Sequence, residues 1–147
     1  MLSVQINKAL MGVQGPVNLS FDVELVEGSA TAIVGPSGSG KTTLLKCIAG
    51  IEELGKGSVE FEKNTWQKGN RTIIPLEKRG IGFVFQDYAL FPNMTVQENI
   101  SFGAENNDSQ EVQDLIQAME LTSLVNQQST RLSAGQKQRV AIARALA

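Results

Sequence analysis

The sequence predicts an α/β fold in which a strand-rich first part is followed by a helical second part. Three observations support this prediction. Apolar and polar residues alternate near the N-terminus, as they do in half-buried antiparallel strands. A glycine-rich segment, residues 35–43, then lies between an apolar run and a helical pattern. Finally, three helix-capping patterns follow in the second half of the chain.

The first part begins with two predicted antiparallel strands, residues 2–6 and 17–25, in which every second residue is apolar. Residues 30–34 form a continuous apolar run without alternation, which predicts a strand that is covered on both faces. A helix is expected over residues 42–49. Gly50 is placed to end that helix in the left-handed conformation that glycine favours.

Further strands are predicted after this helix. Residues 59–61 show one strand pattern, and residues 71–74 show another that stops at Pro75. Residues 81–85 are expected to form a second buried strand, which ends at Gln86.

The second part is predicted to be helical because a helix-capping residue is followed three positions later by Glu or Gln in three places. These pairs are Thr95 with Glu98, Asp108 with Glu111, and Ser133 with Gln136. A polar break at residues 103–107 separates the first two helices. We therefore expect a core at residues 1–86 and a helical subdomain at residues 87–147, which together form one incomplete domain.

Composition restricts the classes of function. The 147 residues contain no histidine, which excludes a histidine general base, a histidine metal site and a histidine-dependent triad. A formal net charge of −2 gives no support for binding to nucleic acid or to a charged membrane surface. No apolar stretch is as long as a membrane span, and residues 1–5 lack the pattern of a signal peptide. The single Cys47 is expected to pack in the core, and a cytoplasmic location is expected.

The glycine-rich segment has the pattern of a phosphate-binding loop: a glycine, four free positions, and then Gly-Lys-Thr at a helix start. Its glycines allow successive backbone N–H groups to point at phosphate oxygens. The helix start adds unpaired N–H groups and a partial positive charge. Lys41 brings a full charge to the outer phosphates, and the Thr42 hydroxyl can ligate Mg²⁺. The predicted nucleotide-binding residues are Gly35, Pro36, Ser37, Gly38, Ser39, Gly40, Lys41, Thr42 and Thr43.

A second motif brings a family resemblance. Residues 132–145, Leu-Ser-Ala-Gly-Gln-Lys-Gln-Arg-Val-Ala-Ile-Ala-Arg-Ala, resemble the signature segment of ABC-type ATPases. That segment is usually Leu-Ser-Gly-Gly-Gln, so Ala134 replaces the first glycine. A serine hydroxyl and bare N–H groups at a helix start form an anion site, although alone they are also an ordinary helix cap.

A third match is the segment Gly-Phe-Val-Phe-Gln-Asp-Tyr-Ala-Leu-Phe-Pro, which resembles the Q-loop of the same family. In that loop a glutamine, here Gln86, reaches Mg²⁺ and the attacking water from the end of a core strand. Taken alone, Gln86 would be an ordinary strand-to-loop glutamine. The nearby Tyr88, Leu90 and Phe91 either pack inside the helical subdomain or line the groove where family members receive a helix of the membrane subunit.

The resemblance covers essentially the whole chain and implies the P-loop NTPase fold of ABC ATPases, with ATP and Mg²⁺ as ligands. It implies catalytic roles for Lys41 and Gln86, and Mg²⁺ coordination by Thr42 and Gln86. It also implies a head-to-tail homodimer that sandwiches two ATP molecules. The residues that would contact the γ-phosphate held by the partner's Lys41 are Ser133, Gly135 and Gln136.

The same resemblance extends to partners. Residues 81–103 look most like importer ATPases for inorganic anions, iron, polyamines or sugars. Such ATPases bind transmembrane permease subunits at the inner face of the cell membrane and no nucleic acid. An adenine-stacking aromatic is missing near Met11 and Val13, which is similar to the molybdate importers. We therefore expect an importer of molybdate or another inorganic anion.

In this family the signature helix is followed by an apolar strand ending in Asp-Glu and then by a switch histidine, whereas this chain ends at Ala147. Hydrolysis depends on such positioned groups, so we expect the complete protein to be the ATPase and this chain alone to be inactive. Two alternatives stay open. One is a nucleotide-binding module that does not hydrolyse ATP, and the other is a soluble ABC ATPase without a transporter.

Overall fold

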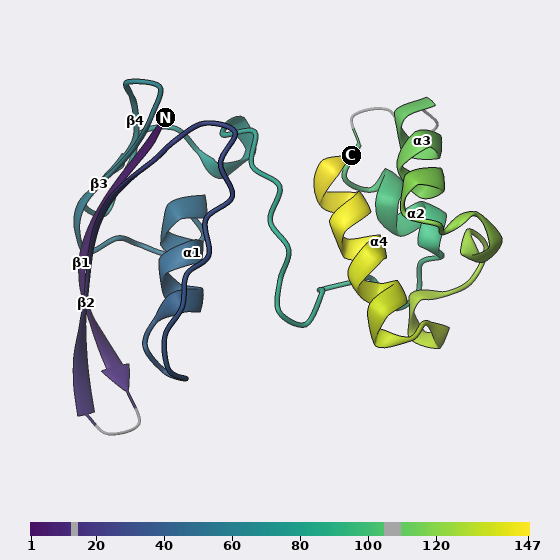
Figure 1. Cartoon of the computed structure of the whole chain (residues 1–147), viewed down its shortest axis with the longest axis horizontal. Helices are drawn as coiled ribbons and strands as arrows, with labels where there is room; N and C mark the ends of the chain where they lie inside the picture. The colour runs from purple at the N-terminus through teal and green to yellow at the C-terminus, as the bar shows by residue number, and fades with distance from the viewer. Residues whose placement is uncertain (13–14, 105–109) are drawn as a thin grey trace. The chain divides into compact units, whose positions relative to one another are not determined.

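The computed structural model describes residues 1–12, 15–104 and 110–147. These residues form two units, Met1–Ile81 and Gly82–Ala147, which we take in turn (Figure 1).

The division after Ile81 falls slightly before Gln86, where the sequence places the end of the first part. Three features expected from the sequence lie outside the described residues. They are Val13, Asp108 with its capping pattern, and residues 105–107 of the polar break.

The described residues of the first unit form a five-stranded antiparallel sheet in the order β2-β1-β3-β4-β5. β1 and β2 pair from Leu2 opposite Leu25 to Gly12 opposite Gly15, which confirms the two predicted N-terminal strands. This register sets Leu2, Val4 and Ile6 opposite Leu25, Val23 and Phe21, on one face of the sheet. The strands are β1 (Leu2–Gly12), β2 (Gly15–Leu25), β3 (Lys56–Phe61), β4 (Asn64–Lys68) and β5 (Arg71–Thr72).

Helix α1 (Lys41–Ala49) lies against one face of this sheet (Figure 1). Its Leu44 and Cys47 are buried among apolar residues of β1 and β3, as expected for a core-packing cysteine. Burial of a leucine side chain contributes about 1.5–3 kcal/mol, so this contact holds the helix and the loop before it on the sheet. Gly50 ends the helix with φ 85°, as predicted.

Two predicted buried strands are wrong. Residues 30–34 lie within the described range but form no strand, and Val34 is 91% exposed. Residues 81–85 form no strand either. An apolar run favours extended backbone, but a strand requires a neighbour that completes its hydrogen bonds. Neither segment pairs with β2 or β5, the edge strands of the sheet. Conversely, β4 was not predicted, because its single buried apolar residue, Trp66, is surrounded by polar ones.

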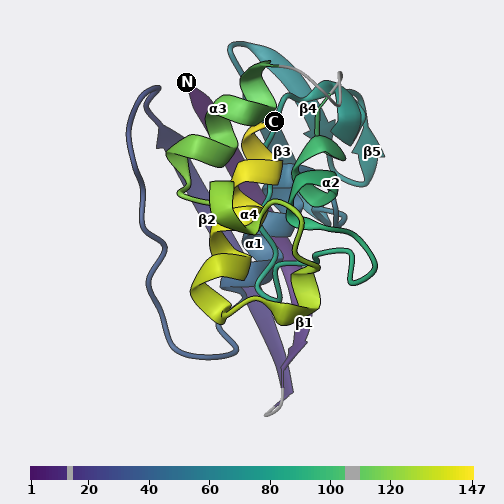
Figure 2. The same cartoon turned by 90° about the vertical axis from the view of Figure 1, so that its right-hand side faces the viewer.

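The second unit packs α2 (Val96–Ser101), α3 (Gln110–Ala118) and α4 (Ala134–Leu146) around a core of its own. α4 lies beside α2 in both views (Figures 1 and 2). The buried apolar residues of this core are Val96, Ile100, Val112, Ile116, Leu121, Leu132, Val140 and Ala143. Within the described ranges, no helix is long and apolar enough to cross a membrane.

Both capping boxes that fall on described residues are present, so these two predictions are confirmed. Thr95 begins α2 and Ser133 begins α4, each in exchange with the side chain three positions later. Reciprocal caps of this kind satisfy two backbone N–H groups that a helix start leaves unpaired.

Candidate functional site

The glycine-rich loop of the first unit, residues 35–43, turns tightly before it enters α1. The amide of Ser39 donates to the carbonyl of Pro36 at 3.3 Å. Gly40 has φ 89°, and a Cβ at this position would lie 3.1 Å from Cδ1 of Leu10 and 3.3 Å from Cδ1 of Leu19. Because both leucines belong to the β1-β2 hairpin, the hairpin packs directly on the end of the loop. Glycine is therefore needed here for its backbone conformation and for its size.

Lys41 closes the loop on itself. Its Nζ atom donates hydrogen bonds of 2.8 Å to the carbonyl oxygens of Gly35 and of Pro36. The ammonium group has three N–H donors, so it can bind a further acceptor while it holds the loop. It is the single charged side chain of residues 35–43, which makes this loop a cationic cradle.

The start of α1 is open to an anion. Gly40 is the N-cap and, among the described residues, no side chain caps this end. The first helical hydrogen bond runs from Leu44 N to Gly40 O at 2.8 Å, which leaves the amides of residues 41–43 at the end of the helix. The first turn carries no acidic residue, so nothing opposes the partial positive charge of the helix N-terminus.

The other end of α1 is held by a buried arginine. Arg79 is 6% exposed, and its guanidinium donates to Ile48 O at 3.2 Å, Ile74 O at 2.9 Å and Trp66 O at 3.4 Å. It also donates to Oε1 of Gln67 at 3.3 Å. Burial lowers the pKa of Arg79, but a guanidinium stays charged at any ordinary pH. The positive charge lies against the carbonyl end of α1, where the helix dipole favours it.

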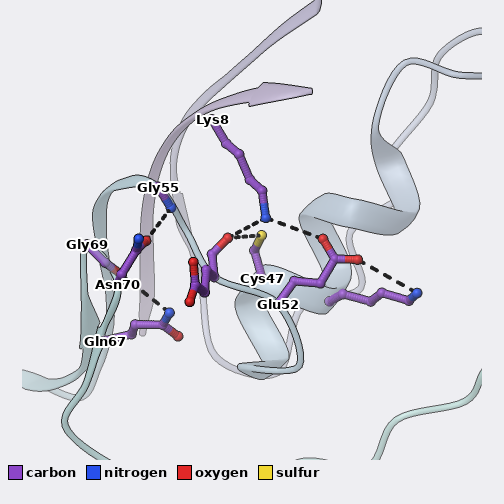
Figure 3. Close-up of polar contacts among 9 residues, drawn as sticks. Lys8, Cys47, Glu52, Gly55, Gln67, Gly69 and Asn70 are labelled. Atoms are coloured by element: carbon purple, nitrogen blue, oxygen red, sulfur yellow. Dashed lines mark hydrogen bonds and ion pairs between the residues drawn. The ribbon is translucent and has the colours of Figure 1, made fainter. Parts of the chain in front are cut away.

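A second polar cluster joins α1 to β1 (Figure 3). Lys8 Nζ lies 3.4 Å from Oε2 of Glu52 and donates to Glu53 O at 2.6 Å. The Cys47 thiol donates to the same Glu53 carbonyl at 3.3 Å, and Lys46 lies 3.8 Å from Glu52. Burial raises the pKa of the Cys47 thiol, so this cysteine is an inert part of the core. The loop is thus presented by a helix that is fixed at its far end.

Gln86, in the second unit, lies exposed in a turn. The amide of Tyr88 closes this turn with a 2.9 Å bond to the carbonyl of Phe85. Tyr88 and Ala89 both have positive φ, 65° and 44°, which is uncommon for residues with a side chain. Their carbonyl oxygens accept hydrogen bonds of 2.9 Å and 2.8 Å from the guanidinium of Arg144.

The apolar residues after Gln86 pack within the second unit. Leu90 packs against its core, and the ring of Phe91 lies 4.5 Å from that of Phe102, between centroids. The described part of this unit also has a groove of about 540 Å³, but neither Leu90 nor Phe91 lines it. Its lining residues are Met94, Thr95, Gln97, Glu98, Ser101, Phe102 and Asn126.

The signature segment forms the start of α4. Ser133 Oγ accepts from the amide of Gln136 at 3.3 Å, and Gln136 Oε1 accepts from the amide of Ser133 at 2.8 Å. The serine hydroxyl proton and the glutamine NH₂ group can still be donated, because both bonds use oxygen acceptors. Gly135 is exposed, and a Cβ there would meet nothing within 4 Å. This end of the helix offers several N–H and O–H donors to an acceptor outside the unit.

Metal binding is restricted by the donor set. The described residues contain no group of three or more His, Cys, Asp or Glu side chains that could hold a metal ion. Thr42 and Gln86 are exposed and carry neutral oxygens. Mg²⁺ at phosphate-transfer sites is bound by few protein groups together with substrate phosphates and water, and each of these oxygens, one in each unit, is of a kind that such sites use.

The structure thus brings Gly35, Pro36 and Lys41 together in the first unit, and Ser133 and Gln136 together in the second. Gln86 and the signature segment lie in the unit that does not contain the loop. Sequence reasoning missed three residues that support these elements, Arg79, Asn99 and Arg144. Arg144 carried a signal, because it is a charged residue within the apolar run 140–146, whereas Arg79 and Asn99 lie among other polar residues and carried none.

Asn99 is fully buried in α2, and its side-chain amide nitrogen donates to the carbonyls of Phe91, Met94 and Thr95 at 2.9–3.2 Å. Its Oδ1 accepts from the amide of Phe91 at 2.9 Å. One side chain therefore shapes the loop between Gln86 and α2.

Comparison with known proteins identifies the family that this chain resembles. A family model described as ABC transporter matches residues 18–147. The sulfate/thiosulfate import ATP-binding protein CysA of Nephroselmis olivacea is 47% identical over 133 residues, 86% of this chain and 37% of that protein. The molybdenum import ATP-binding protein ModC of Methylococcus capsulatus is 46% identical over 132 residues, 88% of this chain and 37% of that protein. For the Fe(3+) ions import ATP-binding protein FbpC of Yersinia pestis, the identity is 46% over 131 residues, 86% of this chain and 37% of that protein. The chain spans little more than a third of these relatives.

Solved structures show the same likeness. A dimeric bacterial ABC transporter cassette superposes with a TM-score of 0.82 and 30% identity, over 99% of this chain and 69% of that one. The cbiO1 protein of Clostridium perfringens, part of the cbiONQ ABC transporter complex, gives a TM-score of 0.76 and 30% identity. That match covers 99% of this chain and 60% of cbiO1.

Proposed function

We propose that this chain, which belongs to the ABC transporter family and has the fold of its ATP-binding domain, is part of an importer subunit that couples ATP hydrolysis to solute uptake. The observation that carries this proposal is the cradle formed by Lys41 and the open start of α1. It concentrates one full positive charge and several backbone N–H groups at a single point.

In the proposed complex, the β- and γ-phosphates of ATP lie in this cradle. Lys41 donates to the outer phosphates, the amides of Gly38 and Gly40 line the turn around them, and the Ser39 amide keeps the turn closed on the Pro36 carbonyl. Gly35, Pro36 and Ser37 shape the turn, and Thr42 and Thr43 lie in the first turn of α1. Thr42 ligates Mg²⁺, which supplies charge neutralisation of the phosphates when it is bound.

Gln86 is proposed to complete the site by contacting Mg²⁺ and orienting the attacking water with its side-chain amide. Its exposure on a turn that is fixed by hydrogen bonds suits this role. Catalysis of phosphoryl transfer consists mainly of positioning and charge stabilisation, so a neutral side chain with one acceptor and two donors is sufficient here.

The second unit is proposed to act on the nucleotide of another subunit. Ser133, Gly135 and Gln136 would donate hydrogen bonds to the γ-phosphate held by the partner's Lys41 in a head-to-tail homodimer. The capping box supports this role, because it holds the serine and glutamine side chains while their donors stay available. The dimeric cassette that superposes on this chain has the matching assembly state.

We propose an inorganic anion as the solute, since the relatives above are named for sulfate or thiosulfate import and for molybdenum import. The subunit would act at the inner face of the cell membrane through permease subunits. The test is uptake of labelled sulfate and of molybdate by cells that lack the gene for this chain. Loss of energy-dependent uptake of either anion supports the proposal, and unchanged uptake of both would remove it.

The second candidate is a nucleotide-binding module that does not hydrolyse ATP. It is favoured by the loop and the first turn of α1, which provide binding groups and carry no acidic residue. Phosphate release from Mg·ATP separates the two candidates. Bound nucleotide without phosphate release from the complete protein would leave only the binding module.

A further inference from the structure

Arg144, in the last turn of α4, joins this helix to the turn that carries Gln86. Its Nη1 donates to Ala89 O at 2.8 Å and its Nη2 donates to Tyr88 O at 2.9 Å. The guanidinium also lies 5.6 Å from the centre of the Phe91 ring. One side chain thus makes a two-pronged contact with consecutive carbonyls far away in the sequence.

Both carbonyls belong to residues that need outside support. Tyr88 and Ala89 have φ of 65° and 44°, a left-handed conformation in which the Cβ atom crowds the backbone. Such residues persist only where their surroundings hold them. The fork of Arg144 is the contact that binds both of them, and it acts on the backbone rather than on the side chains.

The contact of Arg144 with the Tyr88 carbonyl stabilises the same turn that contains Gln86. The turn containing Gln86 is closed by the Tyr88 amide on the carbonyl of Phe85, so the same Tyr88 peptide is held by Arg144 and by the turn. The Gln86 side chain is exposed, which means that its placement depends on its backbone and not on packing.

The position of Arg144 is itself fixed by close packing. A Cβ on Gly103 would lie 2.2 Å from the carbonyl oxygen of Arg144, and one on Gly82 would lie 2.3 Å from that of Ala145. Bare glycine backbone therefore lies on the last turn of α4 on both sides. Burial lowers the pKa of Arg144, but the guanidinium remains charged and keeps its donors.

We infer that Arg144 is a positioning residue that sets Gln86 through the backbone of Tyr88 and Ala89. The helix that carries Arg144 near its end begins at the Ser133 cap, so α4 links the signature cap to the Gln86 turn. The effect of Arg144 on the binding of Mg²⁺ and ATP rests on the proposed function. Its stabilisation of the turn at Tyr88 and Ala89 does not.

The first test uses the full chain without nucleotide and follows amide hydrogen exchange by NMR. The reporter is the Tyr88 amide, and the internal reference is the Val96 amide, which donates to the carbonyl of Gln127 at 2.9 Å. Arg144→Ala should speed exchange at Tyr88 roughly tenfold and leave Val96 unchanged. Arg144→Lys should give a smaller increase, since lysine keeps a positive charge and N–H donors but lacks the planar guanidinium that binds both carbonyls in a fixed geometry.

Arg139→Ala is the matched control. Arg139 lies on the same helix and donates to Met119 O at 3.0 Å and to Glu120 at 2.9 Å, but it does not contact the turn. The variant should leave Tyr88 exchange unchanged. Equal exchange at Tyr88 in the original chain and in Arg144→Lys and Arg144→Ala would overturn the inference. If Arg144→Ala does not fold, Arg144→Lys alone decides.

The second test measures how much Mg²⁺ tightens ATP-γ-S binding. Arg144→Ala should reduce this Mg²⁺ effect as much as Gln86→Ala does, and combining the two should reduce it no further. Affinity without Mg²⁺ should stay unchanged, which a general loss of structure would not allow. If the double variant loses the sum of the two single losses of the Mg²⁺ effect, Arg144 does not act through Gln86. If the original chain binds no nucleotide, the proposed function fails, while Tyr88 exchange still decides the role of Arg144.

Discussion

The Nζ atom of Lys41 lies 2.8 Å from the carbonyl oxygen of Gly35, so the first residue of α1 is joined to the first residue of the glycine-rich loop. A second bond of 2.8 Å reaches Pro36. The loop is therefore held closed around its own cation before any ligand arrives. A bound phosphate needs little rearrangement of the backbone, because the charge and the curled chain are already in place.

Replacement of Lys41 by alanine tests this relationship. Lys41→Ala removes the charge that would contact the outer phosphates, and a hydrogen bond to a charged group contributes about 1.5–3 kcal/mol. We expect ATP-γ-S affinity to fall about 10- to 100-fold in titration calorimetry. Lys46→Ala is the control, since Lys46 lies in the last turn of the same helix, 3.8 Å from Glu52. Equal affinity of Lys41→Ala and the original chain would count against the loop as a phosphate site.

Alanine substitutions at Gly38 and Gly40 distinguish backbone strain from steric crowding in the same loop. Both have positive φ, 89° and 78°, but a Cβ is crowded only at Gly40. Gly38→Ala should lower the unfolding free energy of the first unit by about 1–2 kcal/mol through backbone strain. Gly40→Ala should cost about 1–3 kcal/mol more, through contact with Leu10 and Leu19. The fluorescence of Trp66, the single tryptophan, reports unfolding of this unit. Equal losses would show that the hairpin does not pack on the loop.

Arg79 should be a major contributor to the stability of the first unit. Arg79→Met leaves the carbonyls of Ile48 and Ile74 without the donor that Arg79 provides, whereas the Trp66 carbonyl keeps the amides of Ile73 and Ile74. We expect a loss of about 2–4 kcal/mol in denaturant unfolding followed at Trp66. Arg71→Met, on the exposed edge of the sheet, should change stability by less than about 0.5 kcal/mol. Similar stability of both variants would contradict the anchoring role.

Glu98 gives the second unit a dependence on acid. Its carboxylate accepts hydrogen bonds from the backbone amide of Thr95 at 2.7 Å and from its hydroxyl at 2.9 Å. These bonds, the backbone one above all, hold the pKa of Glu98 below its usual value. The folded-state pKa is thus below the unfolded one. The cap is therefore fully effective above the unfolded pKa of about 4.3 and weakens as pH falls through the folded pKa.

The measurement is an NMR pH titration of the Glu98 carboxyl and the Thr95 amide. Both signals should change together at a pH below the ordinary range of glutamate. Glu98→Gln should remove this change at Thr95, because an amide can cap without titrating. Titration of Glu98 at its usual pH would contradict the cap in solution.

Ser133→Arg tests the proposed contact between subunits. An arginine at the start of α4 would fill the space of the partner's nucleotide and remove a helix cap that contributes about 1 kcal/mol. We expect the complete protein to bind Mg·ATP-γ-S normally but to stay monomeric in light scattering. Ser123→Arg, at an exposed serine of the same unit, should still dimerise. An ATP-dependent dimer of Ser133→Arg would remove the signature segment from the interface.

Local signals predicted much of this structure. Alternation over residues 2–6 and 17–25 identified the hairpin, because period-two patterning and a tight turn act over short distances. Capping at Thr95 and Ser133, and the end of α1 at Gly50, were also predicted, since each depends on residues within one turn. The fold of ABC ATPases followed from the motifs and agrees with the solved structures.

Features that depend on distant residues were not predicted correctly. Residues 30–34 and 81–85 are apolar enough for strands, but strand formation depends on partners elsewhere in the sheet. The bonds of Arg79 to Ile48 and of Arg144 to Tyr88 join residues that are far apart in the chain. No periodicity encodes such contacts, because they arise only when the elements have packed.

Titration calorimetry of Mg·ATP-γ-S into the 147-residue chain, with light scattering on the same sample, tests the central claim most directly. We predict saturable binding of about one nucleotide per chain, because the loop, Lys41 and the start of α1 form one anion site. Absence of saturable binding in a folded, non-aggregated sample would contradict the assignment of this loop as the nucleotide site.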